Sequence, residues 1–247
     1  IGSNVLTRKD GTLDITRMSA LVDQVAELHH KGYDIILISS GAVASGRSEI
    51  KVGKKLDSLS ARQLYSAVGQ AKLINRYYEL FREHGMACGQ VLTTKESFGS
   101  RTHYLNQKHC MEVMLANGVI PIVNENDTVS VTELMFTDND ELSGLVAQMM
   151  KAELLVILSN VDGVFTGNPE DPESELIRTV QAEEDYSQCV SNSKSKYGRG
   201  GMMTKCNVAR RLAKGGIPVV IANGRRDDVI IRIIDGDGSL PCTKFLK

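Results

Sequence analysis

Short apolar segments alternate with longer segments of helical periodicity along almost the whole chain. The first example runs from Ile15 to His30, with apolar residues three and four positions apart, and is ended by Gly32. The apolar segment Tyr33 to Ser39 follows it and is typical of a strand. Such alternation predicts an α/β fold, in which helices cover both faces of a mostly parallel sheet as a three-layer αβα sandwich.

The same periodicity predicts the remaining elements. Helices are expected at 58–83, 101–116, 140–151 and 202–214, and strands at 86–93, 119–124, 154–159, 217–222 and 229–234. A chain of 247 residues can bury a substantial core as one domain, although the length would also permit two small domains. We predict a single domain over residues 1–247.

Composition narrows the class of partner. The 29 basic and 30 acidic residues leave a net charge of -1, so no overall field attracts nucleic acid or an anionic membrane. Aromatic residues are 5% of the chain, which argues against stacking platforms for single strands. The cysteines show no C-x-x-C spacing, and neither a signal peptide nor an apolar run of roughly 20 residues is visible. We therefore expect a cytoplasmic protein with a small-molecule partner.

Two clusters of carboxylate and amide side chains follow one apolar strand. Asn124 to Asp127 come directly after that strand, where open α/β sheets bind ligands, and Asp138 to Asp140 open a predicted helix. A small hairpin between Val129 and Phe136 would bring the second cluster beside the first. Capping of the helix by Thr137 or Asp138 would explain a lone cluster. Two clusters together favour a binding pocket.

Two glycine-rich segments are candidates for holding phosphate. Ser39 to Gly46 follows a strand, and its small residues would let backbone N–H groups approach an anion, although a turn that needs Gly41 explains the segment as well. Residues 198–205 place glycines before a helix whose first turn carries Lys205, an unfavourable position near the positive end of the helix dipole. We favour a bound phosphate there over a solvated lysine.

A third polar turn follows the apolar segment 154–159 and begins with Asn160. It is suited to contacting a nucleotide base and ribose, although any strand and loop could look the same. The sequence contains no G-x-x-x-x-G-K-[ST] segment, no histidine constellation for a metal and no G-x-S-x-G elbow. A Walker A loop, a metal centre and covalent hydrolysis therefore have no support.

Five segments together resemble the amino acid kinase family: SSGAVASG, VIPIVNENDTV, TDNDELSGLVA, LLVILSNVDGVFT and GRGGMMTK, in this order. The resemblance covers nearly the whole chain, and NEND, DND and GGM-x-TK as a set are similar to the members that phosphorylate glutamate rather than acetylglutamate or aspartate. It implies the amino acid kinase fold and transfer of the γ-phosphoryl group of ATP, accompanied by Mg²⁺, to the side-chain carboxylate of L-glutamate. The acyl phosphate would pass to a glutamyl phosphate reductase on the route to proline.

The resemblance also implies site residues. Positions that match substrate-binding residues are Ser40, Gly41, Asn124, Asp127 and Asn139. Positions that match ATP-binding residues are Ser159, Asn160, Arg199, Gly200, Gly201, Met202, Met203, Thr204 and Lys205. The expected catalytic residues are Lys205, Asp138 and Asp140. Lys205 would neutralise charge on the transferring group, and the sequence leaves open which aspartate organises the magnesium or Lys205. No residue is assigned as a metal ligand.

The two ends of the sequence depart from the family's pattern. In the family a first strand ends in a lysine that contacts the transferring phosphoryl group, whereas this sequence starts at Ile1, after that position. Loss of that cation would cost several kcal/mol of barrier, so we expect that the natural chain begins further upstream. The sequence ends at Lys247, without the PUA domain that many bacterial members append.

Two other functions stay open at this point. One is another small-molecule kinase of the same fold, acting on acetylglutamate, aspartate or a nucleoside monophosphate. The other is a non-catalytic homologue that senses glutamate, proline or nucleotide. Feedback inhibition by proline and homo-oligomerisation through the helical region Ser58 to Glu83 are further expectations.

Overall fold

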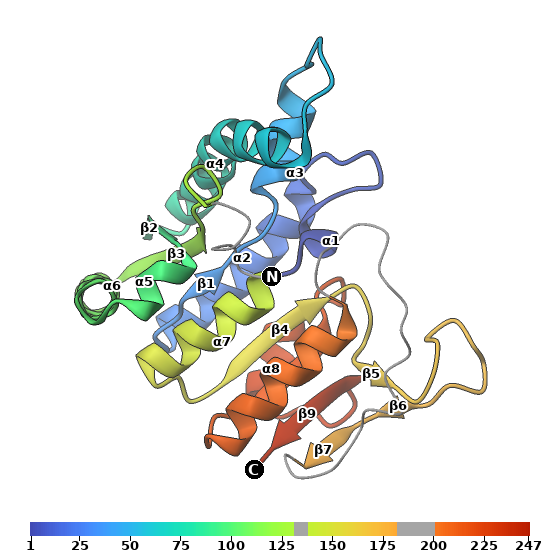
Figure 1. Cartoon of the computed structure of the whole chain (residues 1–247). Helices are drawn as coiled ribbons and strands as arrows, with labels where there is room; N and C mark the ends of the chain where they lie inside the picture. The colour runs from blue at the N-terminus through green and yellow to red at the C-terminus, as the bar shows by residue number, and fades with distance from the viewer. Residues whose placement is uncertain (131–137, 182–200) are drawn as a thin grey trace. The chain divides into compact units, whose positions relative to one another are not determined.

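The computed structural model describes residues 1–130, 138–181 and 201–247, which divide into two compact units (Figure 1). The first unit contains residues 1–5 together with 138–181 and 201–247, and the second contains residues 6–130. Helices and strands alternate along the chain, and most strand pairs are parallel. The α/β class predicted from the sequence is therefore confirmed, while the single domain stays a prediction.

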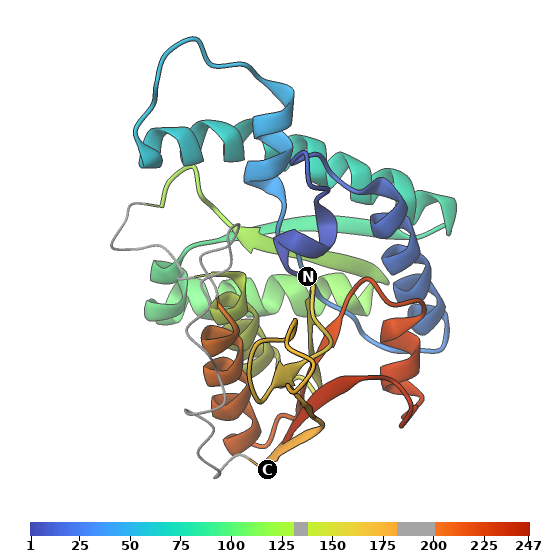
Figure 2. The same ribbon diagram turned by 90° about the vertical axis from the view of Figure 1, so that its right-hand side faces the viewer.

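The second unit is built around a three-stranded parallel sheet in the order β1-β3-β2. Its strands are β1 (Leu37–Ile38), β2 (Ala87–Thr93) and β3 (Val119–Glu125). Its helices are α2 (Ile15–His30), α3 (Ala42–Glu49), α4 (Ser58–Glu83), α5 (Lys95–Gly99) and α6 (Arg101–Ala116). The strand β3 is central and buried on both faces, which explains its continuous apolar run. The helices α4 and α6 lie on opposite sides of β2 and β3 (Figures 1 and 2).

Side-chain caps and glycines set the limits of these helices. Asp57 precedes α4 and accepts hydrogen bonds from the backbone N–H groups of Leu59 and Ser60 at 3.0 and 2.9 Å. Gly32 follows α2 with φ 92° and Gly85 follows α4 with φ 70°, a region that glycine enters without steric cost. Both helices consequently have the limits that the sequence predicted.

The helices α3 and α4 approach each other so closely that two glycines are required. A Cβ atom on Gly46 would lie 1.8 Å from the carbonyl oxygen of Tyr65, and one on Gly69 would lie 1.7 Å from that of Ala42. These neighbours are backbone atoms, which cannot move aside as a side chain can. Gly69, which interrupts the helical pattern in the sequence, is thus a packing residue inside a continuous helix.

The first unit contains a four-stranded sheet in the order β4-β8-β9-β7 and a small antiparallel pair, β5-β6. Its strands are β4 (Leu155–Ser159), β5 (Val164–Phe165), β6 (Leu176–Ile177), β7 (Thr179–Gln181), β8 (Val219–Asn223) and β9 (Cys242–Leu246). Its helices are α7 (Asn139–Met150), α8 (Met202–Lys214) and α9 (Val229–Ile234), and the unit boundary near the N-terminus falls within α1 (Ser3–Leu6). The strands β4 and β8 lie between α8 on one side and α9 on the other (Figures 1 and 2).

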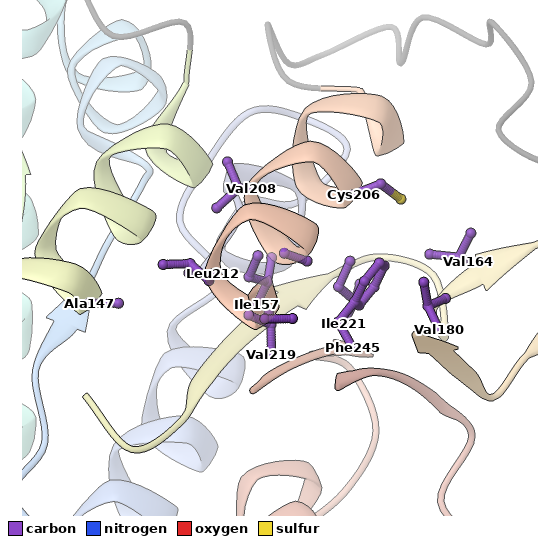
Figure 3. Packing of buried hydrophobic residues seen from close by; sticks show 12 residues of the cluster. Ala147, Ile157, Val164, Val180, Cys206, Val208, Leu212, Val219, Ile221 and Phe245 are labelled. Carbon is purple, nitrogen blue, oxygen red and sulfur yellow. The ribbon is translucent and has the colours of Figure 1, made fainter. Parts of the chain in front are cut away.

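The core of the first unit forms where α8 covers this sheet (Figure 3). Val208 and Leu212 lie on the buried side of α8, and Ile157, Ile221 and Phe245 come from the strands. Residues four apart on a helix share one face, so the apolar stripe of α8 packs against the strands, while Arg211 and Lys214 remain exposed. This packing fixes the start of α8, and with it the position of Lys205.

The last predicted strand is wrong, because residues 229–234 form the helix α9. The run Val-Ile-Ile-Arg-Ile-Ile is β-branched and too short for its period to be read from the sequence. Val229 and Ile233 are the buried members, a spacing of four residues that fits a helix. The strand that completes the sheet is β9, which pairs antiparallel with β8 and was not predicted. Of the strand predicted at 33–39, only Leu37–Ile38 is regular.

None of the helices in the described part of the chain is long and apolar enough to cross a membrane.

Candidate active site

The predicted site residues divide between the two units. The second unit contains Ser40, Gly41, Asn124 and Asp127. The first unit contains Asn139, the three predicted catalytic residues and the described part of the predicted ATP-binding set. Arg199 and Gly200 lie outside the described residues, as does most of the hairpin predicted between Val129 and Phe136.

In the second unit, one arginine of α4 pairs with two of the carboxylates that end β3. Arg62 donates from Nε to Asp127 Oδ1 at 2.5 Å and from Nη2 to Glu125 Oε2 at 2.6 Å. Its Nη2 also pairs with Asp127 Oδ1, and Ser66 Oγ donates to Asp127 Oδ2 at 3.2 Å. Asp127 and Glu125 are only 5% and 3% exposed. Ionised carboxylates are buried at high cost unless they are paired, so Arg62 is what makes their burial possible.

Arg62 is not among the site residues predicted from the sequence. Arg62, Ser66 and Gln70 are four residues apart on α4, and all three donate to the segment that follows or ends β3, the last from Nε2 to the Glu125 carbonyl at 3.4 Å. A polar stripe at helical spacing was visible in the sequence. The sequence did not show which element the stripe would face, because that depends on how α4 packs on the sheet.

The loop Ser39 to Gly41 is fixed by the core beneath it. Ser39 extends the β1–β3 pairing through its backbone N–H, which donates to the Val123 carbonyl at 3.0 Å. Its hydroxyl donates to the Ser40 carbonyl at 3.0 Å and lies 2.8 Å from the Tyr77 hydroxyl, which must then be the donor of that bond. Burial raises the pKa of Tyr77 to about 12, so the donor proton is retained. Gly41 has φ 109°, which confirms the need for glycine at this turn.

Asn124 is also held in place. Its side-chain oxygen accepts the backbone N–H of Glu125 at 2.9 Å, and the residue is 6% exposed. The amide therefore stabilises the turn at the end of β3, next to Asp127.

In the first unit, Lys205 and Asp140 form an ion pair. Lys205 Nζ donates to Asp140 Oδ2 at 2.6 Å, and each side chain is 12% exposed. The sequence left open which aspartate contacts Lys205, and the structure places Asp140 there. The negative charge of Asp140 offsets the unfavourable position of a lysine near the start of α8. The positive charge of Lys205 near the positive end of the α8 dipole is therefore compensated by Asp140 even when no phosphate is bound.

Asp138 caps α7, as the simpler interpretation of the sequence proposed. Its Oδ1 accepts the backbone N–H groups of Asp140 and Glu141, both at 3.0 Å. Its Oδ2 is buried and has no hydrogen-bond partner among the described residues. Burial, followed by the charge of Asp140, raises the pKa of Asp138 to about 6. The cap thus leaves one carboxylate oxygen beside Asp140 that a ligand could use.

The end of β4 and the first residues of the chain lie at the same end of this unit. Gly2 donates its backbone N–H to the Leu158 carbonyl at 3.0 Å, and Gly224 donates to the Ser159 carbonyl at 2.8 Å. Ser159 is buried, whereas Asn160, the first residue of the turn, is exposed.

The described residues offer too few ligands to hold magnesium by themselves, but they could contact a magnesium ion that is also bound to substrate phosphates. No three His, Cys, Asp or Glu side chains gather into a metal site in the part of the chain that the structure describes. Mg²⁺ is usually held by one or two carboxylates, with substrate phosphates and water completing its shell. Asp138 with its unpartnered oxygen fits that kind of contact.

Comparison with known proteins agrees with this fold. The sequence model of the amino acid kinase family matches residues 1–223, so the chain belongs to that family. Two solved structures share the fold: an isopentenyl phosphate kinase in its substrate complex has a TM-score of 0.69 and 16% identity, covering 99% of this chain and 97% of that one. UMP kinase from Bacillus anthracis has a TM-score of 0.65 and 15% identity, covering 99% and 92%.

Two relatives share much more of the sequence than these solved structures do, and both are glutamate 5-kinases. Glutamate 5-kinase of Bacteroides thetaiotaomicron is 66% identical over 246 residues, which are 100% of this chain and 68% of that protein. Glutamate 5-kinase of Chlorobaculum tepidum is 44% identical over 251 residues, covering 100% of this chain and 67% of that protein. The chain thus spans about two thirds of the length of these relatives, and it is a kinase.

Proposed function

We propose that this protein is a glutamate 5-kinase, which transfers the γ-phosphoryl group of ATP to the side-chain carboxylate of L-glutamate. The observation that carries the proposal is the 66% identity to a glutamate 5-kinase along the entire chain. The product would be L-glutamyl 5-phosphate, and the reaction would be the first step of proline biosynthesis.

The residues of the second unit would bind the amino acid. Asp127 is an ionised acceptor suited to the substrate's ammonium group, and its orientation is set by Arg62 and Ser66. The Ser40 hydroxyl belongs to a loop that is fixed by Ser39 and Tyr77, so it can position a carboxylate with little loss of entropy on binding. Asn139, which matches a substrate-binding position of the family, would use its amide to position polar groups of glutamate.

The residues of the first unit would stabilise the transferring phosphoryl group. Lys205 supplies a cation held in place by Asp140, and the backbone from Gly201 to Thr204 opens α8, where free N–H groups and the helix dipole favour an anion. Ser159 and Asn160 would contact the nucleotide. Phosphoryl transfer depends chiefly on positioning and charge stabilisation, so the glutamate carboxylate itself can serve as the nucleophile.

Magnesium would enter with ATP and neutralise charge on its phosphates. Of the described residues, Asp138 is the one whose carboxylate would face it, because Asp140 is committed to Lys205. The remaining proposals follow from the reaction: a glutamyl phosphate reductase would consume the labile acyl phosphate, proline would be a feedback inhibitor, and the enzyme would work in the cytoplasm as a homo-oligomer.

The test is ATP consumption by the full-length natural protein with L-glutamate, N-acetylglutamate and L-aspartate offered separately, and with hydroxylamine to trap an acyl phosphate. We expect glutamate-dependent hydroxamate and little product with the other two acceptors. A folded protein that binds ATP but yields no hydroxamate from any of them would contradict the kinase reaction. Hydroxamate from N-acetylglutamate or aspartate alone would show a kinase of different specificity.

A further inference from the structure

We propose that Arg62 is a positioning residue for the amino-acid substrate, acting through Asp127, and that the start of α4 therefore contributes to the affinity for glutamate. The inference rests on the proposed function, because it assumes that Asp127 accepts the substrate's ammonium group. Arg62 itself is not expected to contact the reacting atoms.

The geometry of the contact supports a positioning role. The guanidinium group reaches Asp127 and Glu125 together, two residues that are separated by one position at the end of β3. Arginine can do this because its N–H groups form a rigid planar fork, whereas lysine offers a single point charge. Replacement by lysine would keep the charge but lose the orientation of at least one carboxylate.

The charges also match the proposed ligand. The two carboxylates and the one guanidinium sum to a net charge of -1, which a bound ammonium group would neutralise. Asp127 accepts from Arg62 and Ser66, and an ionised carboxylate has about four lone-pair directions, so acceptor capacity remains for the substrate. The carboxylate side chains are 4% and 7% exposed and that of Arg62 is 16% exposed, so solvent screens the group only weakly.

A merely structural role is the alternative, and other ion pairs of α4 illustrate it. Arg76 pairs with Glu79 at 2.7 Å, but these side chains are 39% and 52% exposed and lie on the same helix. Exposed pairs of this kind contribute little. Arg76 is therefore a matched control on the same helix, with the same residue type and no contact with Asp127.

The experiment compares Arg62→Lys with Arg76→Lys in the full-length enzyme. We measure kcat, the KM for glutamate and the KM for ATP, together with the melting temperature. Arg62→Lys is expected to raise the KM for glutamate about tenfold, the change that corresponds to one weakened charge-assisted hydrogen bond, while the KM for ATP changes less than about twofold. Arg76→Lys should leave both constants unchanged.

A second variant tests by chemical rescue whether the guanidinium group itself is required. Arg62→Ala removes the guanidinium group from both carboxylates, and added guanidinium ion at low millimolar concentration should restore glutamate affinity without changing the KM for ATP. A KM for glutamate that stays within about twofold in Arg62→Lys, or equal increases for glutamate and ATP, would overturn the proposal. If the unmodified enzyme forms no hydroxamate from glutamate, the proposed function fails, and this result precedes any comparison of variants.

Discussion

Lys205 and Asp140 form an ion pair of 2.6 Å with both side chains largely buried, although 65 residues separate them in the sequence. Asp140 lies in the first turn of α7 and Lys205 in the first turn of α8. The two helix starts are thereby joined by charges of opposite sign, so neither charge is left uncompensated in the absence of substrate. In the proposed reaction, a lysine fixed in this way would need little reorganisation to stabilise a developing phosphoryl charge.

Replacement of Lys205 by methionine should therefore abolish most of the activity. We expect kcat to fall by about 100-fold or more, with a much smaller effect on the KM for glutamate, because the cation acts on the transferring group. Lys214→Met is the control, since Lys214 is exposed at the far end of the same helix. Steady-state kinetics check the result, and a kcat within about threefold of the unmodified enzyme would contradict it. Lys205→Arg retains the charge if the methionine variant is unstable.

Asp138 makes stability depend on pH. Its pKa of about 6 in the folded protein lies above the value of 3.8 for an unperturbed aspartate, so the folded state disfavours the ionised form. The free energy of unfolding should consequently decrease as the pH rises from about 4 to about 6. Asparagine cannot ionise and is also a good N-cap. As the pH rises across this window, the free energy of unfolding of Asp138→Asn should therefore increase by roughly 1 to 2 kcal/mol relative to that of the unmodified protein.

Urea unfolding at pH 4.5, 5.5 and 7 measures this difference. The control is Asp57→Asn at the start of α4, where hydrogen bonds from Ser60 lower the pKa of Asp57. Because the pKa of Asp57 is shifted downward and not upward, the effect of Asp57→Asn should change much less between pH 4.5 and 7 than that of Asp138→Asn. An effect of Asp138→Asn that is equal at all three pH values would show that Asp138 has no raised pKa.

Gly69 should not tolerate even a methyl group. The Cβ of an alanine would lie 1.7 Å from the Ala42 carbonyl oxygen and 2.5 Å from the Gly46 backbone nitrogen, so α3 and α4 would have to separate. We expect Gly69→Ala to lower the free energy of unfolding by about 3 kcal/mol or more, or to prevent folding. Gly53→Ala is the control, because no atom lies within 4 Å of its Cβ position. Thermal unfolding decides, and equal melting temperatures for the two variants would be incompatible with this packing.

The buried hydroxyl of Thr243 joins three strands of the first unit. It accepts the backbone N–H of Val164 at 2.8 Å and donates to the Ile177 carbonyl at 2.6 Å. Thr243→Val keeps the shape but removes both of these hydrogen bonds, which should cost about 2 kcal/mol. Thr243→Ser keeps the hydroxyl and should lose much less. Denaturant unfolding compares them, and a valine variant as stable as the serine variant would refute the role of the hydroxyl.

The sequence by itself determined the elements that have a strong local signal. The limits of α2, α4, α6 and α8 agree with the predicted ranges, because periodic apolar residues, glycines and caps act within a few residues of each helix. It also singled out Asp127, Asp138, Asp140 and Lys205 as candidate site residues, since their motifs are contiguous. Local signals failed at residues 229–234, where a short β-branched run fits either a strand or a helix.

Only the tertiary structure decided which side chains meet. Arg62 contacts Asp127 across 65 positions of sequence, and Lys205 contacts Asp140 rather than Asp138. Glycine normally weakens a helix, yet Gly69 is required inside α4 because another helix passes against it. These relationships depend on how helices pack on sheets and on one another, which is set by the burial of whole apolar faces rather than by neighbouring residues in the chain.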